Sequence, residues 1–319
     1  MTRLVNCRKM MPDFSAVFAN LAYYLPVGLL FVAVLVGAGL LSVPEAASAA
    51  ERLDRSVTID GIERTYTVLL PDNASNKRDL RVMIVFHPAT GTGDYMENIT
   101  RLHELPGSEN FVVVYPDGFA RVWNAGACCG PAKRRDIDDV AFFNAIMRDV
   151  GTLASVRPKA YLTGFSNGAF LVYHLMCEVG DRIAAAVPYG GYLEPDAMRG
   201  CRGGPIPLMH IHGGADETMS PNGGETDFMG LMPPASTTVA WVAKRNGADV
   251  SNPITVDMPM LGTTCQRYTG ATAASETSIC IIPGLGHVWP GVKMRTTKFG
   301  PARPDVQGSQ AIIDFFLRY

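Results

Sequence analysis

Hydrophobic residues occur in short runs separated by polar segments over most of the chain. Runs rich in β-branched or aliphatic residues predict buried strands at residues 64–70, 81–86, 111–115, 159–163, 184–188, 206–212 and 277–282. Apolar positions at helical spacing predict a helix that begins near Asp138 and further helices over residues 167–177, 236–246 and 309–319. Because strands alternate with helices, we expect an α/β fold with a mostly parallel sheet covered on both faces.

The N-terminal segment, residues 1–50, has a different pattern. Basic residues at positions 3, 8 and 9 precede a stretch without charge, and its apolar centre spans residues 25–43. The small residues Ala47, Ser48 and Ala49 follow, as at a signal-peptidase site, so we expect a signal peptide followed by one domain over residues 51–319, outside the cytoplasm. The alternative is an uncleaved signal anchor, because the apolar centre is long enough to cross a bilayer. Only that alternative would attach the protein to a membrane.

The composition indicates a globular protein. Of the 319 residues, 47% are hydrophobic, and the formal net charge is −2, which gives no reason to expect disorder or a nucleic-acid partner. Residues 51–319 contain no repeat and no linker rich in serine, threonine or proline. A single large domain is therefore expected.

The cysteines predict disulfides. Cys7 would leave with a cleaved leader, and an even number of cysteines then remains in an oxidising compartment. No Cys-x-x-Cys or His-x-x-x-His spacing occurs, so we do not expect a zinc site. The favoured pairs, which short loops would join, are Cys177 with Cys201 and Cys265 with Cys280. Two residues would remain as a vicinal pair or as free thiols, namely Cys128 and Cys129.

The strongest local signal is the sequence GFSNG at residues 164–168, which contains Ser166. It directly follows a predicted strand and directly precedes a predicted helix. A sharp strand-to-helix turn between small residues exposes the serine Oγ at the edge of the sheet, above the helix N-terminus. Ser166 is therefore the candidate nucleophile. The alternative is an ordinary glycine-rich turn with a helix-capping serine.

A serine hydroxyl needs a base to take its proton, and in this arrangement the acid and the histidine follow the serine along the chain. His287 lies in a glycine-rich loop after the last predicted strand, which makes it the candidate base. His174 falls within a predicted helix, and His210 and His212 lie on or at the end of a strand. We expect these three to be packed or surface histidines.

The candidate acid is Asp216, in the loop GGADE that follows the strand at residues 206–212. Its place after the nucleophile helix and the next strands suits the residue that orients a catalytic histidine. Asp249 is the second choice, and Glu217 is adjacent to Asp216 but would point elsewhere. A helix cap or turn aspartate is the structural alternative for Asp216.

An oxyanion hole requires backbone N–H groups from the residue after the nucleophile and from a loop after an early strand. Asn167 supplies the first. The second loop begins at His87, and because Pro88 has no N–H, Ala89 is the preferred donor and Thr90 the next. His87 is expected to be structural.

Taken together, these segments resemble the secreted esterases of the polyhydroxybutyrate depolymerase-like family, which includes feruloyl and acetylxylan esterases and has the α/β-hydrolase fold. The resemblance covers about residues 64–289, and Pro88 departs from the glycine that the family usually has there. It implies that Trp123, Asn124 and Trp289 border the substrate pocket, whereas core packing is the alternative for the two tryptophans. The matching segments are HPATG, WN followed by CCG, DDV, GFSNG, HGGAD and GLGHVWPG.

These observations predict a secreted serine esterase that hydrolyses carboxylic esters through an acyl-enzyme without a metal or organic cofactor. The resemblance implies hydroxyalkanoate oligomers, feruloyl esters and acetyl esters as substrates. A serine peptidase or acyltransferase on the same fold is one alternative, and a non-catalytic binding module is another. We expect the short segment after His287 to be the closing part of the domain and not a polymer-binding module, so soluble esters and oligomers are expected to react faster than crystalline polyester.

Overall fold

The computed structural model describes residues 51–319 apart from positions 127, 129, 227–229 and 294–297. The predicted signal peptide or anchor, residues 1–50, lies outside the described residues. Among the helices that are described, none combines the length and the apolar character needed to span a bilayer.

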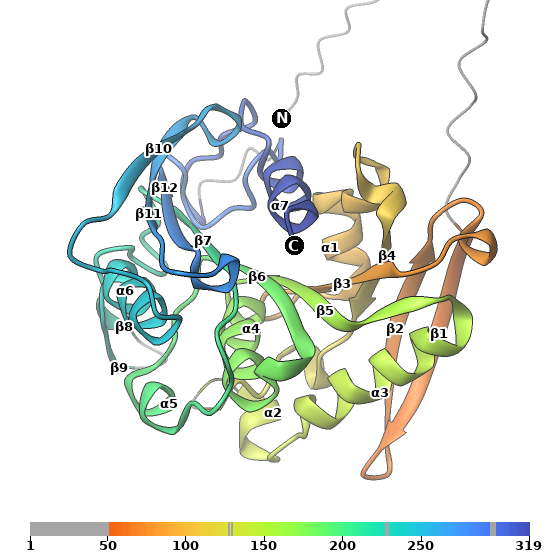
Figure 1. Ribbon diagram of the computed structural model, residues 1–319. Coiled ribbons are helices and arrows are strands. Elements are labelled where there is room, and N and C mark those ends of the chain that lie inside the picture. The colour runs from red at the N-terminus through yellow and green to blue at the C-terminus, as the bar shows by residue number, and fades with distance from the viewer. Residues whose placement is uncertain (1–50, 127, 129, 227–229, 294–297) are drawn as a thin grey trace, which may run out of the picture. The chain divides into compact units, whose positions relative to one another are not determined.

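A single large sheet of ten strands forms the centre of the described domain (Figure 1), in the order β1-β2-β4-β3-β5-β6-β7-β12-β11-β10. The pairs between β4 and β12 are parallel, and antiparallel pairs occur at both ends of the sheet. The strands are β1 (Glu51–Ile59), β2 (Ile62–Leu70), β3 (Leu80–Phe86), β4 (Phe111–Pro116), β5 (Val156–Phe165), β6 (Ile183–Tyr189), β7 (Leu208–Gly213), β10 (Ile254–Met258), β11 (Thr263–Tyr268) and β12 (Thr277–Ile282). A separate hairpin comprises β8 (Gly224–Thr226) and β9 (Gly230–Met232).

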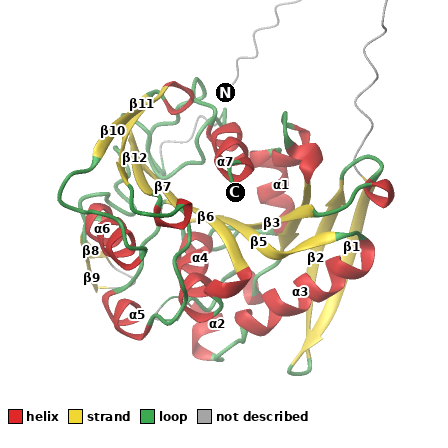
Figure 2. Ribbon diagram, viewed as in Figure 1, coloured by secondary structure: helices red, strands yellow, loops and turns green. Residues whose placement is uncertain are grey.

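Helices cover both faces of the sheet (Figure 2). Successive side chains of a strand point to opposite faces, and β3 shows this plainly: Val82 and Ile84 pack in one apolar cluster with α3, α4 and α6, whereas Met83 and Val85 pack in another with α1 and α7. The sheet is therefore buried on both sides, as the continuous apolar runs predict. The helices are α1 (Gly93–Thr100), α2 (Gly130–Arg134), α3 (Asp139–Leu153), α4 (Asn167–Glu178), α5 (Pro195–Gly200), α6 (Ala235–Arg245) and α7 (Gly308–Leu317).

The predicted strands correspond to β2 to β7 and β12, and the four predicted helices correspond to α3, α4, α6 and α7. Asp138 is the N-cap of α3, where its side chain accepts a 2.6 Å hydrogen bond from the backbone N–H of Ala141. The strands at the sheet ends, β1, β10 and β11, were not predicted. Their exposed charged and polar residues interrupt the apolar pattern, because these strands are not fully buried.

Two disulfides link neighbouring elements, as the sequence predicts. Cys177 near the end of α4 is bonded to Cys201 just after α5, and Cys265 on β11 is bonded to Cys280, its register partner on β12. In both pairs the Cα atoms lie 4.3 Å apart. Cys129 lies outside the described residues, so the predicted vicinal pair stays a prediction.

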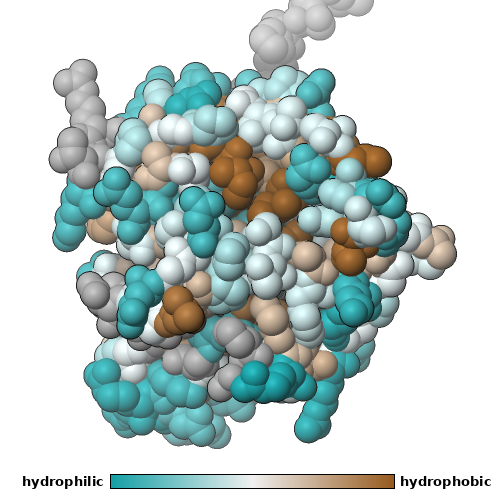
Figure 3. Space-filling view, turned by 90° about the vertical axis from the view of Figure 1, so that its left-hand side faces the viewer, coloured by the Kyte–Doolittle hydropathy of each residue, from teal (hydrophilic) through white to brown (hydrophobic). Residues whose placement is uncertain are grey.

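The face that carries β10 and the β8–β9 hairpin is mostly hydrophilic, with separated hydrophobic spots (Figure 3). The large hydrophobic side chains that the described part of the chain exposes come from several segments: Leu231, Val250, Ile254 and Phe299. Hydrophobic residues scattered in this way are normal on a globular surface.

Candidate active site

The candidate residues lie in loops that leave one edge of the sheet. Strands β3, β5, β7 and β12 belong to its parallel part, so their carboxyl ends meet at the same edge. The loop after β3 holds Ala89, the turn after β5 holds Ser166, and the loops after β7 and β12 hold Asp216 and His287. Ligand and catalytic sites of open α/β sheets occur at this edge.

Ser166 occupies a strained turn between β5 and α4. Its φ is 55° and its ψ is −118°, a backbone conformation that residues other than glycine rarely adopt. The turn is close-packed, because a Cβ at Gly164 would lie 2.5 Å from the Gly168 carbonyl oxygen, and one at Gly168 would lie 2.8 Å from that of His87. Both positions of the GFSNG motif therefore require glycine, because a side chain there would clash with the neighbouring backbone. The backbone N–H of Ser166 is fixed by a 2.9 Å hydrogen bond to the Tyr189 carbonyl.

Asp216 and His287 are in direct contact. The Nδ1 atom of His287 lies 2.7 Å from Oδ2 of Asp216, and the two side chains are almost completely buried. The other carboxylate oxygen, Oδ1, accepts hydrogen bonds from the backbone N–H groups of Thr218 at 3.0 Å and Met219 at 2.7 Å. These bonds fix the carboxylate plane, so Nδ1 of His287 carries the proton and Nε2 is left as the free base.

The two alternative acids do not reach His287. Asp249 lies on the surface, where its carboxylate accepts hydrogen bonds from the backbone and hydroxyl of Ser251. Glu217 is exposed beside Asp216. Of the three acidic candidates, the geometry joins Asp216 alone to His287.

The loop that carries His287 is fixed from both sides. The buried hydroxyl of Tyr189 donates to the carbonyl oxygens of Gly286 at 3.2 Å and Val288 at 2.5 Å, the two neighbours of the histidine. The backbone N–H of His287 itself donates to the Phe299 carbonyl at 2.6 Å. The imidazole is therefore held by its own backbone as well as by Asp216.

The end of β6 lies between the serine turn and the histidine. Tyr189 accepts the hydrogen bond from Ser166 N–H, and a Cβ placed on the next residue, Gly190, would lie 3.5 Å from Cε1 of His287. The ring of Phe165, which precedes the serine, lies 4.8 Å from the His287 ring between centroids. These contacts bring the candidate nucleophile and the candidate base to the same place.

The loop after β3 leaves Ala89 as the better of its two oxyanion candidates. The N–H of Thr90 donates to the Arg121 carbonyl at 2.8 Å, whereas within the described part of the chain no backbone acceptor takes the Ala89 N–H. His87 stabilises this loop: the Gly118 N–H donates to its Nε2 at 2.8 Å, so its Nδ1–H donates to the Pro88 carbonyl at 2.8 Å. Burial lowers the pKa of His87 to about 4, and the ring stays neutral.

Asn167 connects the serine turn to the segment that contains Trp123. Its side-chain oxygen accepts a 2.8 Å hydrogen bond from the backbone N–H of Trp123, and its amide donates to the Trp123 carbonyl at 3.3 Å. The indole N–H of Trp123 in turn donates to the His87 carbonyl at 2.8 Å. The two proposed oxyanion segments are thus tied together through one tryptophan.

The two tryptophans that are expected to border the substrate pocket are both buried, and their place beside the pocket stays a prediction. Trp123 is 0% exposed and Trp289 is 1% exposed, and the Trp289 indole donates to the Ser309 hydroxyl at 3.0 Å. Both indoles bury their apolar surface and use their N–H groups internally, so core packing describes them. Asn124 is partly exposed, and its amide donates to the Ile137 carbonyl at 3.0 Å.

A buried ion pair next to this region was not predicted from the sequence. The guanidinium of Arg64 lies 2.7 Å from Oδ1 of Asp139, with both side chains buried. The second oxygen of Asp139 accepts the backbone N–H of Asn124 at 2.7 Å, and the guanidinium lies 4.2 Å from the Phe142 ring centroid. The pair therefore supports the segment next to Trp123. Its sequence signal is weak, since an arginine on a strand is usually exposed.

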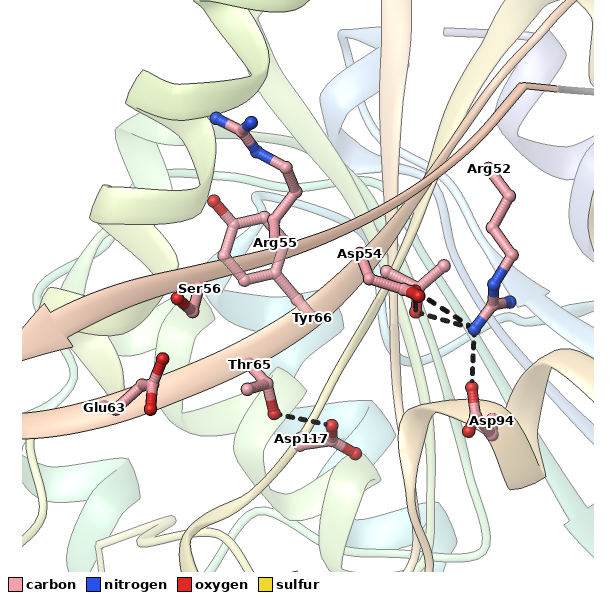
Figure 4. A pocket seen from close by; sticks show the side chains of 10 residues that line it. Arg52, Asp54, Arg55, Ser56, Glu63, Thr65, Tyr66, Asp94 and Asp117 are labelled. Atoms are coloured by element: carbon pink, nitrogen blue, oxygen red, sulfur yellow. Dashed lines mark hydrogen bonds and ion pairs between the residues drawn. The ribbon is translucent and has the colours of Figure 1, made fainter.

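A separate polar hollow of about 400 Å³ lies beside β1, β2 and α1 (Figure 4). Arg52 faces the carboxylates of Asp54 and Asp94 there, at 3.2 and 2.8 Å, and the Thr65 hydroxyl donates to Asp117. None of the three candidate catalytic residues lines it. Arg52 pairs with two of its carboxylates and Arg55 pairs with Asp149 outside the hollow, so we assign it no role in the chemistry.

Over the residues that the structure describes, no group of three or more histidine, cysteine, aspartate or glutamate side chains is arranged to hold a metal ion.

The comparisons with known proteins agree with this architecture. No family model matches the chain. Feruloyl esterase B of Piromyces equi is 27% identical over 247 residues, which cover 72% of this chain and 44% of that protein. "Putative esterase NocK" of Nocardia uniformis subsp. tsuyamanensis is 26% identical over 82% of both chains. This chain thus spans less than half of feruloyl esterase B.

Among solved structures, the acetyl xylan esterase from Aspergillus awamori matches with a TM-score of 0.53 at 17% identity, over 74% of this chain and 94% of that one. The sheet order and the loops at its carboxyl edge define the chain as an α/β-hydrolase fold, which confirms the predicted fold class. Within that class, the chain is similar to esterases, and feruloyl esterases are among its relatives. The predicted resemblance to feruloyl esterases is confirmed.

Proposed function

We propose that this protein hydrolyses carboxylic esters through an acyl-enzyme. The observation that carries the proposal is the 2.7 Å hydrogen bond between Asp216 and His287, beside the strained turn of Ser166. A serine, an imidazole and a carboxylate in this relation form the activated nucleophile of serine hydrolases.

In the proposed reaction, Oγ of Ser166 attacks the ester carbonyl carbon while Nε2 of His287 accepts the hydroxyl proton. The imidazolium is stabilised by Asp216, and the backbone N–H groups of Asn167 and Ala89 donate to the oxyanion of the tetrahedral intermediate. His287 then gives the proton to the leaving alcohol. Water attacks the acyl-enzyme by the same route, which releases the acid and restores the serine.

Feruloyl and acetyl esters are the first substrates to consider, because proteins named for those activities are similar to this chain. Hydroxyalkanoate oligomers follow from the motif resemblance described for the sequence. We also propose an extracytoplasmic location, which the two disulfides support, since disulfides persist in oxidising compartments.

The proposal is tested with a substrate panel: p-nitrophenyl acyl esters, methyl ferulate, acetylated xylan, hydroxybutyrate oligomers, crystalline polyester granules and a p-nitroanilide peptide. We expect turnover of at least one soluble ester and labelling by a fluorophosphonate. Selective cleavage of the anilide would favour a peptidase, and transfer to an added alcohol in preference to water would favour an acyltransferase. Failure of both labelling and turnover would support a non-catalytic binding module.

A further inference from the structure

A line of hydrogen bonds runs from helix α4 through strand β7 to the acid loop. The hydroxyl of Tyr173 lies 2.8 Å from Nδ1 of His210, Nε2 of His210 lies 3.0 Å from Nδ1 of His212, and Nε2 of His212 lies 2.7 Å from the Met219 carbonyl oxygen. Tyr173, His210 and His212 are each 0% exposed. The mechanism above uses none of these side chains.

The positions of the protons along this line are set by its last acceptor, the Met219 carbonyl oxygen. A carbonyl oxygen can only accept, so Nε2 of His212 must carry a hydrogen. Neutral His212 then has a bare Nδ1, which accepts from Nε2–H of His210, and the bare Nδ1 of His210 accepts from the hydroxyl of Tyr173. If Tyr173 accepted instead, both neutral rings would reverse, and a nitrogen lone pair would face the Met219 oxygen. One arrangement of neutral rings therefore satisfies every contact.

Both histidines are held in the neutral form. Desolvation by burial lowers the pKa of His210, as does its neighbour His212, and burial is also the largest influence that lowers the pKa of His212. The charged group that faces His212 is the Asp216 carboxylate, which acts in the opposite direction, while His287 lowers the pKa further. The ring of Tyr192 covers the remaining side at 5.6 Å between centroids.

The line ends on the residue that orients the acid. Met219 gives its backbone N–H to Oδ1 of Asp216 at 2.7 Å, while its carbonyl is the group that His212 holds. Nε2 of His212 also lies 3.6 Å from Oδ2 of Asp216, the oxygen that contacts His287. The N–H of His212 therefore binds the Met219 carbonyl, and the Asp216 carboxylate lies beside it.

We propose that Tyr173, His210 and His212 are positioning residues for the acid: the Tyr173 hydroxyl donates to Nδ1 of His210 and so supports the tautomers that the Met219 carbonyl sets, in which the N–H of His212 binds that carbonyl and holds the Asp216 loop in place. None of the three touches substrate. The inference rests on the proposed function, because Asp216 has a catalytic role only if His287 is the base.

Removal of the Tyr173 hydroxyl is the sharpest test, because this atom is three hydrogen bonds away from Met219. In Tyr173→Phe, we expect kcat on a p-nitrophenyl ester to fall about tenfold with KM unchanged, far less than the roughly 10⁴-fold loss expected of a wrong His287 tautomer. Poorer alignment of Asp216 destabilises the imidazolium of His287. The lower of the apparent pKa values in the pH profile of kcat/KM should therefore decrease. The control is Tyr115→Phe, whose hydroxyl is equally buried and contacts Thr100 instead.

Two substitutions of His212 provide a rescue comparison. The amide nitrogen of Gln reaches about as far as Nε2 of histidine, so His212→Gln retains a donor for Met219, whereas the shorter side chain of His212→Asn does not. We expect the Gln variant to retain more of kcat than the Asn variant at the same thermal stability. Equal kcat in the two folded variants, or a Tyr173→Phe enzyme that matches the wild type in kcat and pH profile, would overturn the proposal.

Nuclear magnetic resonance spectroscopy determines the tautomers of the two histidines independently of catalytic activity. Long-range ¹H–¹⁵N spectra of the wild type should show His210 and His212 neutral and protonated on Nε2 at pH 7. A proton on Nδ1 of His212, alone or with Nε2, would contradict the inference. Failure of the proposed function would appear differently, as the absence of ester turnover and fluorophosphonate labelling in a protein whose tautomers are as stated.

Discussion

Asp216 and His287 meet through a single hydrogen bond, although 71 residues separate them along the chain. Asp216 uses its second oxygen for two backbone N–H groups, so the carboxylate cannot rotate away from the imidazole without losing them. Because the proton on Nδ1 of His287 is held by this contact, Nε2 is the nitrogen that remains basic.

Replacement of Asp216 by asparagine should lower kcat by about 10⁴-fold, because the amide N–H stabilises the tautomer with the proton on the wrong imidazole nitrogen. Asp249→Asn is the matched control, since Asp249 is an exposed aspartate bonded to Ser251, and this variant should retain wild-type kcat. Steady-state hydrolysis of a p-nitrophenyl ester measures both. A larger loss in Asp249→Asn than in Asp216→Asn would contradict the assignment.

Ser166→Ala should abolish acyl-enzyme formation, with a loss of about 10⁶-fold in kcat and no loss of folded structure. The side chain has no hydrogen-bonded role as a helix cap, so the smaller residue removes the nucleophile alone. Fluorophosphonate labelling, a pre-steady-state burst and the far-UV circular dichroism spectrum check this. A variant that still shows the burst would place the nucleophile elsewhere.

Much of the parallel sheet and the three catalytic candidates could be predicted from the sequence, because their signals are local. A continuous apolar run indicates a buried strand. In GFSNG, both glycines are recognisable from the sequence, and any other residue there would clash with the neighbouring backbone. Strand β1 was missed because Arg52, Asp54 and Arg55 interrupt its apolar positions, and these charges form ion pairs only in the folded chain.

Residues that act through distant partners could not be predicted. His210 and His212 were expected to be packed or surface histidines, and both are buried, but their hydrogen-bond partners include Tyr173 from another element. The roles of Trp123 and Trp289 were implied by resemblance alone, and the structure places both in the core. Burial of a large aromatic side chain depends on the packing of several elements at once.

Asp139→Asn should destabilise the fold by about 3–5 kcal/mol, because it leaves the guanidinium of Arg64 buried without a counter-charge. Guanidinium chloride unfolding at pH 7 measures the free energy of unfolding. The double variant Arg64→Leu with Asp139→Leu removes both charges and should recover most of the loss. If the single and double variants were equally unstable, packing rather than the unpaired charge would be the cause.

The disulfide between Cys265 and Cys280 closes a short loop, with a sequence separation of 15. The double variant Cys265→Ala with Cys280→Ala should lower the free energy of unfolding by about 3 kcal/mol, chiefly because the unfolded chain gains freedom. Urea unfolding with and without reductant checks this. Reductant should destabilise the wild type more than the variant, and intact mass after alkylation should show that both pairs are oxidised.

Stability should decrease below neutral pH because of buried neutral histidines. The unfolded His87 side chain binds a proton near pH 6.5, whereas the folded one does so near pH 4, so the unfolded state takes up more protons between these values. His87 alone should lower the free energy of unfolding by about 1.3 kcal/mol between pH 7.5 and pH 5.5. His210 and His212, whose pKa values are also lowered, add to the trend.

Urea unfolding at several pH values measures this dependence, and His87→Gln should show a shallower slope than the wild type. Equal slopes would indicate that His87 is protonated in the folded protein or remains neutral when unfolded.

The parallel pairing of β7 with β12 has a consequence for how the protein refolds. These strands cover Leu208–Gly213 and Thr277–Ile282, and the chain between them forms α6 and two further strands of the large sheet before it returns. Contacts between segments far apart in sequence form slowly, because the ends of a long loop must first meet. Asp216 and His287 lie in the loops after these two strands, so we expect their contact to form only with this pairing. After dilution from denaturant, catalytic activity should therefore recover more slowly than the helical signal in the far-UV circular dichroism spectrum. Ester turnover would then report the formation of the last long-range contacts.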